Sequence, residues 1–189
     1  MSTPTIAGEL APAKRAADLQ LSRRATIAVW VIGAIVVVLC FLHFGLSGHA
    51  FVGAFFAVVL VYLAAFDFEH RLIPNRAVLP ASAIVLTAQI ALYPSHAVEW
   101  LAAAVCTAGF FFVTLLISPT GLGMGDVKLA FLLGAALGTN VVGALLVGTV
   151  AAAVFGGVLI LRGGAQARKT AFAFGPFLAL GGIVALLLS

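Results

Sequence analysis

The chain has 189 residues, of which 63% are hydrophobic and only 8% are Asp, Glu, Lys or Arg, and its formal net charge is +4. A soluble domain is about half apolar and about a quarter charged, so this composition excludes an ordinary soluble protein. Apolar runs of roughly 20 residues recur from Ala25 onward, each about long enough to cross a ~30 Å hydrocarbon layer. They lack the alternation of a membrane barrel, so we predict an all-α, polytopic membrane protein.

Residues 1–24 are polar, and we predict a cytoplasmic N-terminal tail there, with a short surface helix around residues 11–21. A membrane-embedded domain is expected over residues 25–189. Its apolar runs predict about seven crossings, at residues 25–46, 49–66, 77–94, 98–117, 126–138, 141–161 and 170–188. The fifth would rise only ~20 Å as an α-helix, so six crossings is the alternative.

The basic residues support this map. With the N-terminus inside, every Lys and Arg falls in a cytoplasmic segment, and the far side receives His49, His96 and Glu99 but no strong base. The positive-inside rule predicts this asymmetry. Without the fifth crossing, the bases after the sixth run would lie outside, so we retain seven.

Two kinds of site are not expected. The Lys and Arg residues are too few and too scattered for a face that tracks phosphates, so no nucleic-acid partner is predicted. Cys40 and Cys106 are isolated within apolar runs, and no C-x-x-C pair exists, which argues against a zinc ribbon or a disulfide framework. We expect no metal and no cofactor.

Asp67 and Asp126 are the candidate catalytic pair. The map puts Asp67 at the end of the second span and Asp126 at the start of the fifth, on the same side and at similar depth. An acid that borders a span is costly, so a functional role is a fair default. Two carboxylates held close share one proton, because like charges in a low-dielectric site cannot both ionise cheaply. One carboxylate can then deprotonate a water molecule while the other carboxyl group donates its proton to a carbonyl oxygen, which would permit attack of the water on an amide.

The second acid follows two glycines in "TGLGMGDVKLAFLLG", residues 120–134. Gly123 and Gly125 offer backbone freedom and let another segment approach closely. Asp126 then falls in the first turn of a helix, where the dipole favours negative charge. Lys128 points to a different face, where it either snorkels to the headgroups or shapes the site.

The first acid lies in "FDFEHRLIPNR", residues 66–76. Pro74 biases Ile73 away from helix and suits an early position in the next span, so a short, stiff loop ending near Asn75 would fix the acid. Glu69, His70 and Arg71 are expected to face water and headgroups, and His70 is a secondary candidate for a general base.

These residues resemble a known family. Asp67 with Ile73-Pro74-Asn75, followed by "GMGDVKL" at residues 123–129, resembles the type IV prepilin peptidases, which are membrane aspartic peptidases of the GxGD class. The segment "FGPFLALGG", residues 174–182, is similar to the last helix of bacterial members. The resemblance implies that Asp67 and Asp126 form the catalytic dyad. It also implies a six-helix peptidase core, to which the first span here is an N-terminal addition.

The expected activity is cleavage of the short, basic leader of a prepilin at the cytoplasmic face of the bacterial inner membrane. The implied partners are the prepilin and membrane lipid. The larger bacterial enzymes carry paired C-x-x-C motifs and also methylate the new N-terminus. This chain lacks those cysteines and looks more like the compact peptidases of Flp-type, tight-adherence pili, so no N-methyltransferase activity is expected.

Gly175 and Pro176 are further candidates for shaping the site. Pro176 lies within the last apolar run, and we expect it to kink that span, either for packing or to shape the cavity beside the acids.

Two other functions fit parts of the pattern. Paired intramembrane acids also serve as proton relays, which would suit a small proton-coupled carrier. A carrier is expected to place the acids near the bilayer midplane within an internal repeat, and no repeat is visible. A non-catalytic scaffold for pilus assembly would keep the pilin partner but not the chemistry.

Overall fold

The computed structural model describes residues 19–118, 122–167 and 173–189. Within these ranges the chain forms α-helices joined by short turns, and no β-strand is present. The helices are α2 (Arg23–Phe44), α3 (Gly48–His70), α4 (Asn75–Leu92), α5 (Ala97–Ile117), α6 (Met124–Leu137), α7 (Val141–Ala167) and α8 (Gly175–Leu187), with 3-10 turns at Pro94–His96 and Gly138–Asn140. The all-α prediction is therefore confirmed over the described residues. Most of the surface helix predicted around residues 11–21 lies outside them.

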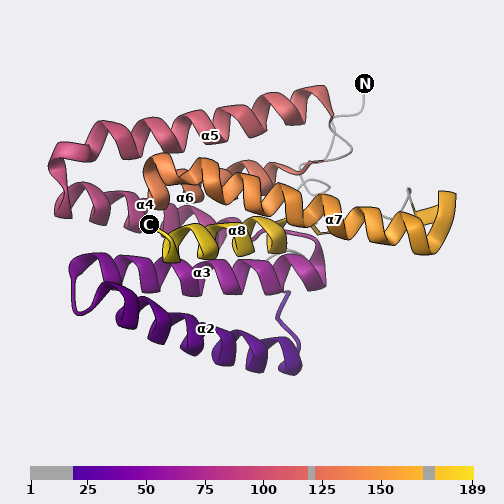
Figure 1. Cartoon of the computed structure of the whole chain (residues 1–189), viewed down its shortest axis with the longest axis horizontal. Helices are drawn as coiled ribbons and strands as arrows, with labels where there is room; N and C mark the ends of the chain where they lie inside the picture. Colours follow the sequence, from indigo (N-terminus) through magenta and orange to yellow (C-terminus); the bar gives the residue numbers. More distant parts are fainter. Residues whose placement is uncertain (1–18, 119–121, 168–172) are drawn as a thin grey trace, which may run out of the picture.

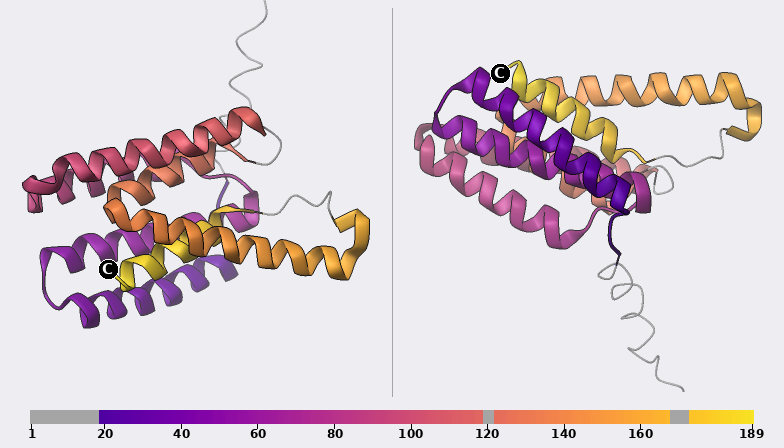
Figure 2. Two further views of the ribbon diagram at one scale, coloured as in Figure 1. Left: turned by 45° about the horizontal axis from the view of Figure 1, so that its top comes forward. Right: turned by 90° about the horizontal axis from the view of Figure 1, so that it is seen from below.

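Five stretches of the described chain are long and apolar enough to cross a membrane. They are α2, α3, α4, Pro94–Ile117 and Met124–Arg162, whereas α8 is shorter, with 13 residues. Met124–Arg162 holds two helices, because the chain reverses between α6 and α7 near Gly138, whose φ is 55° (Figure 2). These helices support a multi-pass membrane protein, and seven crossings stays a prediction.

Successive helices run in opposite directions, so the helix termini gather at two ends of the bundle (Figure 1). The ends of α3 and α5 and the starts of α2, α4, α6 and α8 lie together at what we call the acid end, because it carries Asp67 and Asp126, and α7 projects beyond the bundle on the same side. The Lys and Arg residues of the described ranges occur at this end too: Arg23, Arg24, Arg71, Arg76, Lys128 and Arg162. This gathering of bases agrees with the predicted map.

Helix α8 lies between the two helices that carry the acids. It packs against α3 and α6 and also against α7. A Cβ at Gly182 would lie 2.8 Å from Leu60 Cδ1 of α3 and 2.5 Å from Leu133 Cδ2 of α6. Both leucines are fully buried in the core. The glycine therefore lets α8 fit between α3 and α6 and sets their separation.

Other glycines bring backbones into direct contact. A Cβ at Gly134 of α6 would lie 2.5 Å from the carbonyl oxygen of Ala103 in α5, and one at Gly181 of α8 would lie 2.1 Å from the carbonyl oxygen of Ala144 in α7. Membrane helices associate through close van der Waals packing rather than through the hydrophobic effect. These positions therefore have no room for a side chain.

Replacing Gly134 should destabilise the bundle, because the new methyl group would press on the backbone of α5. Overpacking of this kind costs about 1–3 kcal/mol. We expect Gly134→Ala to lower the unfolding temperature in detergent. The matched control is Gly109→Ala on α5, where a Cβ meets nothing within 4 Å. Since alanine favours helix over glycine, that control should be neutral or stabilising. Equal shifts in the two variants would contradict this packing.

Candidate active site

Asp67 lies in the last turn of α3 and is 6% exposed. The helix ends at Arg71, whose left-handed backbone (φ 52°) turns the chain while its N–H donates to the Asp67 carbonyl oxygen at 2.7 Å. The side-chain Oδ2 of Asp67 accepts a hydrogen bond from the backbone N–H of Gly175 at 2.9 Å. The start of α8 therefore holds the buried carboxyl group in place.

The close contact between the Asp67 carboxyl group and the start of α8 requires glycine at position 175. A Cβ at its position would lie 2.6 Å from Asp67 Oδ2 and 3.1 Å from Asp67 Cγ. The neighbouring Pro176 lies in the first turn of α8, which begins at Gly175. The expected kink in a continuous span over residues 170–188 is therefore wrong. Pro is accepted in a first turn because the N–H that it lacks would have no partner within the helix.

Asp126 occupies the third position of α6, and Gly123 caps the helix. Asp126 Oδ2 accepts from the backbone N–H of Gly123 at 3.0 Å, and the Asp126 N–H donates to the Gly123 carbonyl oxygen at 3.0 Å. The carboxyl group thus lies at the N-terminal end of α6, as the sequence predicted, where the dipole favours negative charge. The hydrogen bonds that the described residues make to the two carboxyl groups engage Oδ2 of each acid.

One cavity of about 890 Å³ at the acid end contains both acids. The predicted residues Pro74, Asn75, Gly123, Gly125 and Lys128 line the same cavity, together with Leu19, Tyr62, Phe66, Arg71, Leu72, Ile73, Arg76, Ala77 and Met124. Gly175 reaches the site through its bond to Asp67, and Pro176 is not part of the lining.

The two sequence motifs meet across this cavity. Lys128 Nζ donates a hydrogen bond to Asn75 Oδ1 at 2.7 Å. A Cβ at Gly125 would lie 2.9 Å from Ile73 Cβ, so the glycine allows the start of α6 to pack on the turn before α4. Pro74 is the N-cap of α4, one position earlier than the first helical residue. Lys128 thus contacts the turn before α4, and its role in shaping the site stays a prediction.

Neither Gly123 nor Gly125 uses an unusual backbone angle, and of the two only Gly125 has a neighbour close enough to require its small size. Gly123 is extended (φ −101°, ψ 158°), and the positive-φ glycines of the described ranges are Gly45 and Gly138. The expected backbone freedom at Gly123 and Gly125 is therefore not used. The sequence also predicts that another segment approaches these glycines closely. Such an approach occurs at Gly125, which Ile73 contacts.

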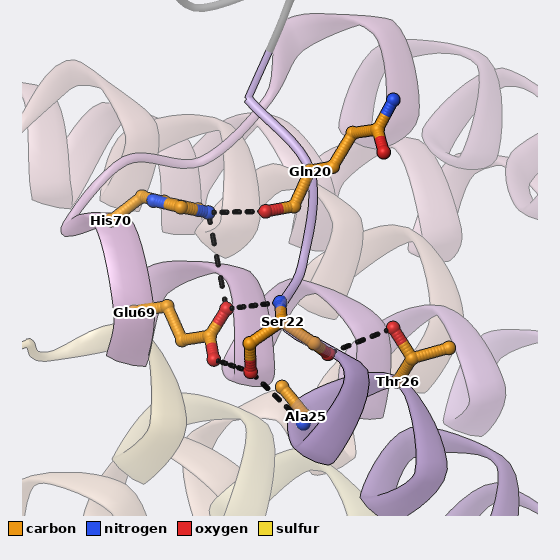
Figure 3. A network of polar contacts seen from close by, with 6 residues as sticks. All are labelled: Gln20, Ser22, Ala25, Thr26, Glu69 and His70. Atoms are coloured by element: carbon orange, nitrogen blue, oxygen red, sulfur yellow. Dashed lines mark hydrogen bonds and ion pairs between the residues drawn. The ribbon is translucent and has the colours of Figure 1, made fainter.

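Glu69 and His70 do not simply face water and headgroups. Both carboxylate oxygens of Glu69 accept hydrogen bonds from Ser22, one from its N–H at 2.9 Å and one from its Oγ (Figure 3). His70 Nε2 lies 3.2 Å from the carbonyl oxygen of Gln20. These contacts tie the start of α2 to the end of α3. His70 is not among the residues that line the cavity.

Sequence reasoning missed three polar residues of the lining. Arg71 and Arg76 flank the Ile-Pro-Asn turn, and they were assigned to membrane topology alone. Tyr62 comes from the body of α3, where nothing in an apolar run distinguishes it from a core residue. The described residues contain no group of three or more His, Cys, Asp or Glu side chains that could hold a metal ion.

The fold and the site together define a polytopic membrane protein with two acids that line one cavity. The sequence pattern of the type IV leader peptidase family matches residues 54–161, which include both acids. The chain therefore belongs to the type IV leader peptidase family. Helix α2 and the "FGPFLALGG" segment lie outside the matched residues.

Curated relatives agree with this family. The prepilin leader peptidase/N-methyltransferase of Bacillus subtilis is 29% identical over 77% of this chain and 59% of its own length. Those of Xanthomonas campestris pv. campestris and Stutzerimonas stutzeri are 30% and 31% identical, over 75% and 77% of this chain and 51% and 52% of their own lengths. The chain thus spans between half and three fifths of these relatives. No solved structure matches it significantly.

Replacing Gly175 should damage the site, because a methyl group there would displace Asp67 or the start of α8. A displacement of about 1 Å can cost on the order of 100-fold in rate, so we expect Gly175→Ala to lose about that much of any activity that depends on Asp67. The control is Gly143→Ala on the exposed side of α7, where a Cβ meets nothing within 4 Å. Equal activity in the two variants would show that the Asp67–Gly175 contact does not matter.

Proposed function

We propose that this protein is an aspartic prepilin peptidase that cleaves the leader of a prepilin and uses Asp67 and Asp126 as its catalytic dyad. The observation that carries the proposal is the shared cavity. Two acids that are 59 positions apart in sequence (126 − 67), on different helices, line one pocket at one end of the bundle. Family membership and the printed names of the relatives support the choice of substrate.

The chemistry follows from a shared proton. One carboxylate takes a proton from water as the water oxygen bonds to the scissile carbonyl carbon, while the other carboxyl group gives its proton to the carbonyl oxygen. The tetrahedral diol then collapses. The first carboxyl group protonates the leaving nitrogen, the C–N bond breaks, and the second carboxylate takes a proton from the diol. The pair returns to its starting state and titrates as a unit.

The backbone contacts at the acids suit this role. The N–H groups of Gly175 and Gly123 each hold Oδ2 of one acid, which fixes the orientation of both carboxyl groups. Side chains fixed in this way lose little freedom when the substrate binds, so the reacting groups are already positioned. Because general acid and general base must be in opposite protonation states, the rate should be bell-shaped in pH.

We assign the acid end to the cytoplasmic side of a bacterial inner membrane, with residues 1–24 as a cytoplasmic tail and residues 25–189 as the embedded domain. The gathering of the described bases at that end supports the orientation. The lack of C-x-x-C pairs in these residues supports a Flp-type prepilin as the substrate. A proton-coupled carrier is less well supported, because both acids lie at one end of their helices rather than midway.

The dyad is tested by replacing each acid with its amide. Asp67→Asn and Asp126→Asn should each reduce cleavage of a purified prepilin in liposomes by on the order of 10²–10⁴-fold. The matched control is Glu99→Gln at the opposite end of the bundle, which should cleave normally. A chelator should leave the wild-type rate unchanged. Full processing by either Asn variant would rule out the dyad, and pilus assembly supported by both would favour a scaffold.

The absence of methylation is tested in the same assay by adding S-adenosylmethionine. The relatives carry N-methyltransferase in their names, whereas this chain has no paired C-x-x-C motif. Mass spectrometry should show a mature pilin with a free N-terminal amine. A mass increase of one methyl group would contradict this part of the proposal without affecting the peptidase.

A further inference from the structure

A second large cavity, of about 970 Å³, lies as a groove between α2 and α4, with α3 as its floor. Both helices pack against α3. Small residues build part of the walls, among them Gly33 and Ala34 of α2 and Ala81 of α4. The floor includes Phe55 and Val58 of α3. Small residues on both sides are the pattern that lets a further helix approach closely within a membrane.

The groove is apolar along its length. No Asp, Glu, Lys or Arg is among its lining residues. Several large apolar side chains in it are well exposed, including Trp30 at 76%, Val38 at 56% and Ile84 at 52%. On α2 the lining runs from Thr26 to Val38, which corresponds to ~18 Å along the helix axis. The groove therefore extends from the acid end about half-way through a hydrocarbon layer.

The groove adjoins the cavity that holds the acids. Leu19, Tyr62 and Ala77 line both spaces. A polypeptide whose scissile bond lies at Asp67 and Asp126 can therefore continue into the groove without leaving the protein surface. A lipid chain could lie in any apolar groove, but nothing about a lipid requires continuity with a pair of catalytic acids.

The wall formed by α2 is fixed at this junction. Ser22 caps α2 through its Oγ, which accepts from the Ala25 N–H at 3.2 Å, and the same residue binds Glu69 at the end of α3 (Figure 3). The polar contacts therefore hold the mouth of the groove within one helical turn of Asp67.

We propose that this groove binds the apolar, membrane-inserted helix of the substrate next to the scissile bond, and so decides which proteins are cleaved. The inference rests on the proposed peptidase function and adds a substrate requirement to it. The cleaved chain must continue as an apolar helix that fits between α2 and α4.

The test uses bulky substitutions that fill the groove, each with a matched control on the same helix. Ala34→Trp and Ile84→Trp place an indole in the groove. Leu39→Trp and Leu79→Trp change residues of α2 and α4 that are 42% and 53% exposed and do not line it. Each variant is assayed on two substrates: full-length prepilin in liposomes, and a soluble peptide that spans the scissile bond but lacks the apolar segment.

The two groove variants should lose at least about tenfold in kcat/KM on full-length prepilin and keep near wild-type cleavage of the short peptide, because only remote binding is removed. The controls should cleave both substrates normally. Wild-type cleavage of full-length prepilin by the groove variants would overturn the proposal and leave the groove to lipid. Equal loss on both substrates would overturn it as well. Failure of the wild-type protein on both substrates would instead reject the peptidase function.

Cross-linking gives a second measurement that needs no catalysis. Ala34→Cys is placed in a background with Cys106→Ser and Asp126→Asn, and single cysteines are scanned through the apolar segment of the prepilin. Cross-links should recur every three to four substrate residues, the spacing of one helix face. Leu39→Cys in the same background should give none. Equal cross-linking from both positions, or none from Ala34→Cys, would overturn the proposal.

Discussion

The contact between Asp67 and the first residue of α8 determines the geometry of the site. A buried carboxyl group is costly unless hydrogen bonds compensate it. Here the compensation comes from the N–H of Gly175, one of the backbone groups that a helix start leaves without an internal partner. Asp126 is held in the same way, because its Oδ2 accepts a hydrogen bond from the backbone N–H of Gly123, the N-cap of α6. Both acids are therefore oriented by backbone groups at helix starts, whose positions do not depend on side-chain rotamers.

This dependence explains why glycines recur around the acids and along α8. Gly175 leaves space for the Asp67 side chain, Gly181 leaves space for the backbone of α7, and Gly182 leaves space for one leucine from each acid-bearing helix. Three glycines of one short segment thus place α8 against three neighbours at once. Because α8 separates α3 from α6, the distance between Asp67 and Asp126 depends on how closely α8 fits, and a side chain at any of these positions would change it.

Much of this arrangement could be predicted from the sequence. Apolar run length located the helices, and the distribution of bases placed the acids at a common end, because these properties depend on composition along the chain. The expected kink at Pro176 was wrong, since run length does not show where a helix begins inside an apolar segment. Glu69 and His70 bind the segment before α2, a contact between distant residues that no local pattern encodes. The roles of Gly123 and Gly125 also differ in ways that only interhelical distances reveal.

Helix α2 lies outside the matched family residues, yet it contacts the part of α3 on which the site depends. The last turn of α3 ends in a left-handed residue, Arg71, a conformation that costs a non-glycine residue about 1–3 kcal/mol. That turn carries Asp67, and Glu69 in it binds Ser22. The bonds at Ser22 thus restrain a strained turn and also fix one wall of the groove. A single polar anchor therefore couples the position of Asp67, the proposed catalytic acid, to the groove that is proposed to bind the substrate, so α2 contributes to the site as well as to the membrane anchor.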